Sequence, residues 1–181
     1  KTGEFHCSNE KVNQLQSNIS WSLRDNFFDI PSDCPQRDER LGWMGDAQVF
    51  SWTAAFNRET ALFFTKWMRD VSAASSLERG VPHIVPDIQE TYSSAAWSDA
   101  AVIIPWVVYQ TYGDTRILEE SWKCMHEWVD YIHNHVNENG MWMTNYQYGD
   151  WLALDREMGD KSVGATDVYF CLLYTSPSPR D

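Results

Sequence analysis

The segment from Ala95 to Tyr112 would carry apolar side chains on nearly every side of a helix. It includes a long apolar run, Val102, Ile103, Ile104, Trp106, Val107 and Val108. A helix that is apolar all round has no face to offer to water, so it has to lie inside a core. Pro105 falls within the segment and predicts either a kink or a late helix start. Any fold for this chain must therefore surround the segment with other elements.

Helices with a single apolar face are predicted on both sides of this segment. The first starts at a Ser8 cap and ends before Pro31, with apolar side chains three and four residues apart at Val12, Leu15, Ile19, Leu23 and Phe27. Others are predicted at about 46–56, at about 58–75 and, after an Asp114 cap, up to about Val136. Residues 29–44, 76–94 and 137–165 have the composition of loops. Strand signals are confined to Val81–Val85 and Met141–Asn145.

The alternation of a buried helix with amphipathic helices indicates concentric layers. Amphipathic helices suit an outer layer, and a helix that is apolar all round suits an inner one. The sequence therefore favours an all-α fold of the α/α-barrel type, although a flat helical bundle would fit the same pattern.

Composition excludes several classes of function. The chain of 181 residues has 26 acidic and 14 basic side chains, a net charge of −12. A nucleic-acid-binding protein needs a basic face, so this balance argues against one. No run of about 18 apolar residues and no signal-peptide pattern is present. The four cysteines and five histidines do not fall into the spacing of a metal site.

Aromatic residues are unusually frequent, with ten Trp, eight Tyr and eight Phe. A flat aromatic ring packs well against the C–H-rich face of a sugar, but large aromatic side chains also dominate ordinary cores. The composition thus permits a carbohydrate-binding protein without requiring one.

The loop from Asp33 to Asp46 concentrates the polar chemistry of the chain. It holds four carboxylates, two arginines, one tryptophan and two glycines. Hydrolysis of a glycosidic bond needs one carboxylic acid that protonates the leaving oxygen and a second carboxylate that activates water or attacks the sugar. Neighbouring carboxylates can raise the pKa of the acid by repulsion, while Arg37 and Arg40 keep others ionised. A solvated, salt-bridged loop in which Asp46 caps the next helix would have the same composition.

The sequence of this loop, DCPQRDERLGWMGD, closely resembles the signature of glycoside hydrolase family 78, the α-L-rhamnosidases. Further stretches match the family in the same order: FFDIP from residue 27, GDAQVF from 45, VP at 81, PD at 86, WSDA from 97 and GDWL from 149. The resemblance runs from about Gly3 to Val168. It implies the N-terminal part of an (α/α)6 barrel, the six-hairpin toroid, in a chain too short to complete it.

The resemblance also implies roles for the residues of the loop. Glu39 matches the general acid that protonates the leaving oxygen. Asp33, Arg37 and Asp46 match residues that bind the hydroxyls of rhamnose, and Trp43 matches an aromatic ring that lines the pocket. Neither a cofactor nor a metal is implied.

Two further tryptophans match aromatic walls of the family site. Trp97 and Trp151 would face the C6 methyl of rhamnose, where an apolar wall disfavours a sugar with a C6 hydroxyl. Ordinary core positions would also suit both rings. Asp38 is expected behind the site, paired with an arginine, and Asp99 and Asp150 are weaker candidates.

The implied activity is that of an inverting exo-glycosidase that removes terminal α-L-rhamnose from glycosides or polysaccharides. The family's general base is a glutamate in the second half of the barrel, and no acidic motif here matches it. We therefore expect a full-length parent to be active and this chain alone to be inactive. The alternatives are a different glycosidase or a lyase on the same toroid, and a non-catalytic carbohydrate-binding protein.

The matching stretches also suggest how the chain is divided. Residues 1–7 would connect from an upstream β-domain, and residues 8–170 would form the first half of the barrel. The end, 171–181, loses helical periodicity in TSPSPRD and resembles translated adapter or vector sequence, although a natural Ser/Pro-rich linker has a similar composition. Family members occur inside and outside cells, so the resemblance implies no particular compartment or oligomeric state.

Overall fold

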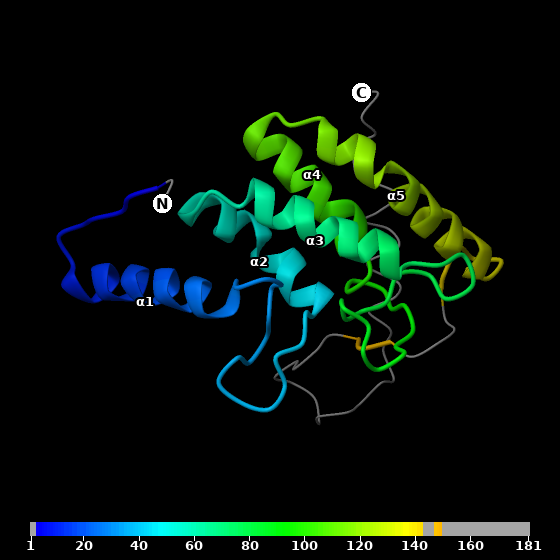
Figure 1. The fold of residues 1–181 in the computed structure, drawn as a ribbon, viewed down its shortest axis with the longest axis horizontal. Coiled ribbons are helices and arrows are strands. Elements are labelled where there is room, and N and C mark those ends of the chain that lie inside the picture. The colour runs from blue at the N-terminus through cyan, green and yellow to red at the C-terminus, as the bar shows by residue number, and fades with distance from the viewer. Residues whose placement is uncertain (1–2, 143–146, 150–181) are drawn as a thin grey trace.

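The computed structural model describes residues 3–142 and 147–149. Five helices follow one another in these residues: α1 (Glu10–Asn26), α2 (Met44–Asn57), α3 (Ala61–Ala74), α4 (Ala100–Tyr112) and α5 (Arg116–His135) (Figure 1). Extended backbone in the described part is limited to isolated bridges. The predicted all-α class is therefore confirmed.

Helix α4 is the centre of the packing, as its all-round apolar sequence predicts. It packs against α2, α3 and α5. Ile104, Val107 and Val108 are each at most 1% exposed. Pro105 lies inside the helix, which begins at Ala100 rather than at Ala95. The helix therefore continues through the proline and does not begin at it.

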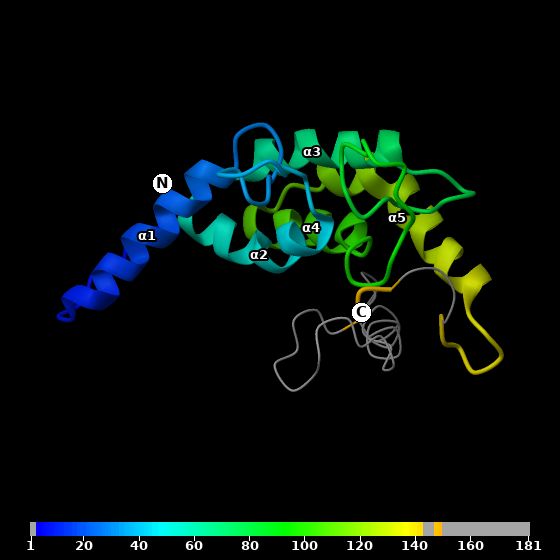
Figure 2. The same ribbon diagram turned by 90° about the horizontal axis from the view of Figure 1, so that it is seen from below.

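The remaining helices form layers around α4. Helices α3 and α5 each turn one face inward and contact one another, and Figure 2 shows α3 lying along one side of α2 and α4. Trp67 of α3 and Trp128 of α5 are almost fully buried. Large aromatic side chains thus fill the space between the layers, which accounts for part of the high tryptophan content.

Helices α1 and α2 keep apolar faces uncovered. Figures 1 and 2 both show α1 extending away from the other helices, and Leu23 is its buried residue. On α2, the exposed large side chains recur at helical spacing, with Val49 at 78%, Trp52 at 51% and Phe56 at 60%. Further helices could pack against this exposed apolar stripe of α2, as expected of an incomplete six-hairpin barrel.

Several predicted boundaries shift by a few residues. Asn9, not Ser8, caps α1, because its side-chain oxygen accepts a hydrogen bond from the Lys11 amide. The cap of α5 is Thr115 rather than Asp114, although Asp114 Oδ1 still accepts from the amide of Arg116 at 3.0 Å. Local hydrogen bonds determine which residue caps a helix, and the spacing of apolar residues does not predict them.

Helices α2 and α3 also begin at other residues than the periodicity predicts. Helix α2 starts at Met44, two residues before Asp46, so Asp46 lies in its first turn and does not cap it. Helix α3 starts at Ala61 rather than near Arg58, which is the C-terminal cap of α2.

The extended piece predicted at Val81–Val85 is present as a single bridge. Ile84 pairs with Trp43 in antiparallel fashion, and the flanking amides of Met44 and Val85 bond to the carbonyls of His83 and Gly42 at 3.0 and 2.9 Å. The second predicted piece, Met141–Asn145, falls mostly outside the described residues, as does the tail 171–181. None of the described helices is long and apolar enough to cross a bilayer.

Gly42 is required by this bridge, which leads to a stability prediction. A Cβ at Gly42 would overlap the carbonyl oxygen of Val85. We expect Gly42→Ala to lower the free energy of unfolding by about 3 kcal/mol, because two backbone segments would have to separate. Gly113→Ala is the control, since Gly113 has φ +68 but nothing within 4 Å of an added Cβ. Gly113→Ala should lower the free energy of unfolding by about 1 kcal/mol, from backbone strain alone. Equal losses in urea unfolding would contradict the close contact.

Candidate active site

The acidic loop folds back on itself, so that its two ends lie side by side. Asp33 and Leu41 form an antiparallel bridge in which the Asp33 amide donates to the Leu41 carbonyl at 2.8 Å. Cys34 and Arg40 adopt positive φ angles of 49° and 57°, which let the chain turn between them. As a result, side-chain oxygens of Asp33 and Glu39 lie within 4.8 Å of each other.

Glu39 is held at both carboxylate oxygens. Arg37 donates to Oε2 from Nε at 3.1 Å and from Nη2 at 2.8 Å. The indole N–H of Trp43 donates to Oε1 at 2.9 Å. The Glu39 side chain is 24% exposed and that of Arg37 is 62% exposed. The structure thus brings together four predicted site residues, Asp33, Arg37, Glu39 and Trp43.

These donors lower the pKa of Glu39 below its ordinary value. The hydrogen bond from Trp43 is the largest cause and the bonds from Arg37 come next, while loss of hydration acts in the opposite direction. Repulsion from neighbouring carboxylates was expected to raise the pKa of the acid, but the pKa of Glu39 is lowered, and Asp33 is among the groups that lower it. Glu39 is therefore ionised at neutral pH while the site is empty.

Asp46 shows the opposite behaviour. Surrounding protein atoms reduce the hydration of its carboxylate and raise its pKa, even though part of the residue is exposed, and the charges of Asp33 and Glu39 add to the shift. Asp46 lies in the first turn of α2, close enough to Asp33 and Glu39 for their charges to affect it. The loop therefore contains one carboxylate with a raised pKa, Asp46, and one with a lowered pKa, Glu39.

The same loop offers a set of atoms with the spacing of metal ligands. Asp33, Cys34 and Glu39 place one ligand atom each within 4.8 Å of one another. However, Cys34 donates its S–H to Asp33 Oδ2 at 3.2 Å, and the pKa of the thiol is raised by reduced hydration and by Asp33. Arg37 and Trp43 already occupy the Glu39 oxygens. The arrangement is that of a hydrogen-bonded carboxylate cluster.

Aromatic rings form a wall beside the carboxylates. His83 lies parallel to the Trp43 ring, with a centroid distance of 5.6 Å and an angle of 12°. Tyr148 contacts Trp43 edge-on and lies 4.3 Å from the centroid of Trp97. Trp97 in turn covers Gly45, where an added Cβ would lie 2.9 Å from the indole. Trp97 is thus brought to the predicted site, and Gly45 of the signature makes room for it.

Sequence reasoning did not identify Tyr148 and gave His83 no specific role. His83 lies in the loop 76–94, from which it could approach the site, and its Nε2 lies 2.9 Å from the Tyr148 hydroxyl. The signals were weak: one histidine inside a loop, and one tyrosine just before a matching GDWL stretch. Trp151 and Asp150 of that stretch lie outside the described residues.

Asp99 stabilises the segment that carries Trp97. It is 1% exposed and accepts hydrogen bonds at 2.9 Å from the Trp128 indole and from the amide of Ala96, which has a positive φ of 67°. Burial raises the pKa of Asp99 to about 6. This arrangement gives Asp99 a structural function. Asp38 pairs with Arg40 at 3.4 Å on the surface.

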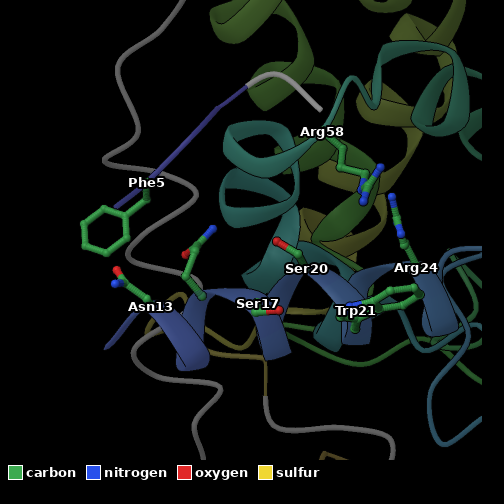
Figure 3. Close-up of a pocket in the computed structure, with 8 residues that line it drawn as sticks. Phe5, Asn13, Ser17, Ser20, Trp21, Arg24 and Arg58 are labelled. Carbon is green, nitrogen blue, oxygen red and sulfur yellow. The ribbon is translucent and has the colours of Figure 1, made fainter. Parts of the chain in front are cut away.

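A hollow of about 270 Å³ lies elsewhere on the molecule, between α1 and the residue after α2 (Figure 3). Trp21, Arg24 and Arg58 are among its lining residues, and Arg24 lies 4.7 Å above the Trp21 ring. The acidic loop precedes α2, and Arg58 follows it, so the length of the helix, roughly 20 Å, separates them. The hollow is therefore distinct from the acidic loop.

The pair of Arg37 and Glu39 leads to a titration prediction. We expect Arg37→Gln to raise the pKa of Glu39, because two hydrogen bonds to the ionised carboxylate are lost. Carbon-13 NMR of glutamate carboxyl groups in the 181-residue chain measures this pKa directly. Arg40→Gln is the matched control, since Arg40 pairs with Asp38 instead. A Glu39 pKa that responds equally to both substitutions would show that Arg37 has no specific effect.

Comparison with known proteins gives consistent results. A family model for the bacterial alpha-L-rhamnosidase 6 hairpin glycosidase domain matches residues 1–176. An alpha-L-rhamnosidase from Formosa agariphila is 46% identical over 161 residues, which cover 88% of this chain and 17% of the relative. One from Streptomyces avermitilis is 40% identical over 170 residues, covering 93% and 16%. The chain thus spans about a sixth of the length of these relatives.

Solved structures agree with the sequence relatives. The α-L-rhamnosidase of Aspergillus terreus superimposes with a TM-score of 0.84 at 39% identity, covering 94% of this chain and 21% of that one. The Streptomyces avermitilis enzyme complexed with L-rhamnose gives 0.77 at 39% identity, covering 82% and 14%. With its buried α4, its layered helices and the signature loop at the start of α2, the chain belongs to the bacterial α-L-rhamnosidase six-hairpin glycosidase family.

Proposed function

We propose that this chain is part of an inverting exo-glycosidase that hydrolyses terminal α-L-rhamnose from glycosides or polysaccharides. The observation that carries the proposal is the placement of Glu39, which is fixed at both oxygens beside Asp33 within the family signature. A solved relative from Streptomyces avermitilis binds L-rhamnose, which supports the choice of sugar.

In this proposal each residue of the loop has a separate task. Glu39 delivers a proton to the leaving oxygen as the glycosidic bond breaks. Asp33, Arg37 and Asp46 bind the hydroxyls of rhamnose. Trp43 lines the sugar pocket, and Trp97 and Trp151 are the rings assigned to the C6 methyl.

The low pKa of Glu39 in the empty site requires a change when the substrate binds. Arg37 uses two of its five N–H donors on Glu39, and it is also the residue proposed to donate to the sugar hydroxyls. We infer that the sugar draws Arg37 away from Glu39. The ionised form then loses two donors, and the exclusion of water also favours protonation of Glu39.

The remainder of the machinery belongs to other parts of a longer protein. We propose that residues 8–170 supply the first half of the barrel, that residues 1–7 connect it to an upstream β-domain and that 171–181 is not native. The general base then comes from the second half, at roughly 6.5–9.5 Å from the acid, which leaves room for the attacking water.

One observation favours a second candidate function. An ionised Glu39 with two donors suits a protein that only binds sugar hydroxyls, because such binding needs acceptors and no proton transfer. A non-catalytic carbohydrate-binding protein is therefore the alternative.

Replacement of Glu39 separates the two candidates. In the full-length protein, Glu39→Gln should lower kcat about 10²- to 10⁴-fold, because the amide cannot act as an acid, and should leave rhamnose binding largely intact. Glu119→Gln, an exposed position at the start of α5, is the control and should retain full turnover. Unchanged turnover in Glu39→Gln would exclude the proposed acid.

The 181-residue chain alone should release no p-nitrophenol from p-nitrophenyl α-L-rhamnoside. The reason is that this proposal assigns the general base, which activates water, to the second half of the barrel. Full-length protein assayed in parallel provides the positive control. Measurable turnover by the short chain would contradict the assignment of the base to the missing half.

A further inference from the structure

We propose that His83 is a positioning residue for Glu39 and that it acts through the indole of Trp43. The proposal rests on the proposed function, because it assigns His83 to the placement of the general acid. Three consecutive contacts lead from Tyr148 through His83 and Trp43 to Glu39.

The first contact is the hydrogen bond from Trp43 to Glu39. An indole has one donor, and its direction is fixed by the plane of the ring. The 2.9 Å distance from Nε1 to Glu39 Oε1 therefore sets the position of that oxygen as long as the ring stays in place. Arg37 provides a weaker constraint, since its side chain is 62% exposed and long.

The second contact fixes the plane of the Trp43 ring. His83 is 8% exposed and stacks on Trp43 at an angle of 12°. The backbone keeps the two residues in register, because the His83 carbonyl accepts from the amide of Met44, the residue after Trp43. A shift of the imidazole would therefore be transmitted to the indole.

The third contact fixes the imidazole. The Tyr148 hydroxyl lies 2.9 Å from His83 Nε2, and its ring meets the His83 ring edge-on at 5.1 Å. Burial lowers the pKa of His83 to about 4, against the attraction of the Asp87 carboxylate. The ring is thus neutral at neutral pH and adds no cation that would compete with Arg37 for Glu39.

A packing role and a positioning role make different predictions. Any ring of similar size would satisfy packing, whereas positioning also needs the polar contact between His83 and Tyr148. His83→Phe keeps a ring and loses this contact, and Tyr148→Phe loses it from the other side with a smaller change in volume. The Tyr148 variant remains informative if the His83 variant does not fold.

The decisive experiment is a double-mutant cycle on the pKa of Glu39. It uses carbon-13 NMR on the 181-residue chain, with Trp43→Phe as the second substitution. We expect His83→Phe and Tyr148→Phe each to raise the Glu39 pKa, since the Trp43 donor moves away. In the Trp43→Phe background neither should have a further effect. His126→Phe, an exposed histidine of α5 paired with Asp130, should leave the pKa unchanged.

Two outcomes would overturn the proposal: an unchanged Glu39 pKa in both single variants, or an equal shift with and without the Trp43 indole. In the full-length protein, His83→Phe should lower kcat roughly 10- to 100-fold with little change in KM, because misplacement affects the reacting geometry more than binding. The NMR cycle needs no turnover. The cycle therefore tests the role of His83 independently of the proposed function, which Glu39→Gln tests.

Discussion

Two backbone hydrogen bonds between residues 42–44 and 83–85 hold the rest of the candidate site in place. They join the end of the acidic loop to the loop after α3, and the Val85 carbonyl that abuts Gly42 also accepts from the buried Trp67 indole at 3.2 Å. The acidic loop is thereby attached to the helical core at the residue before α2 starts. Only a glycine at 42 permits this approach. The pairing also brings His83 close to Trp43, and the two rings stack.

Electrostatic interactions within the loop shift the pKa values of its carboxylates in opposite directions. Glu39 receives donors at both oxygens and has a lowered pKa, whereas reduced hydration and the charge of Asp33 raise the pKa of Asp46. Proximity of like charges alone predicts that one carboxylate is protonated, but it does not say which. Hydrogen bonds decide the question, and in the empty site they assign the charge to Glu39.

Different parts of the structure were predictable to different degrees. The apolar segment around Ile104 has no face for water, so its burial and the layers around it could be inferred from the sequence. The grouping of Glu39 with Arg37 and Asp33 followed from a highly specific loop. The roles of His83 and Tyr148 did not, because their contact spans 65 positions in the chain and depends on the path of two loops. The helix starts at Met44 and Ala61 depend on local hydrogen bonds, which the spacing of apolar residues does not predict.

We propose that Glu39 is ionised in the empty site and gains a proton when the sugar displaces Arg37. Steady-state pH profiles of the full-length protein test it most directly, since kcat/KM reports the free enzyme and kcat reports the enzyme–substrate complex. A general acid loses activity as the pH rises through its pKa. The alkaline limb of kcat should therefore fall at a higher pH than that of kcat/KM, and Arg37→Gln should reduce the gap. Coincident alkaline limbs in the unsubstituted protein would contradict the account.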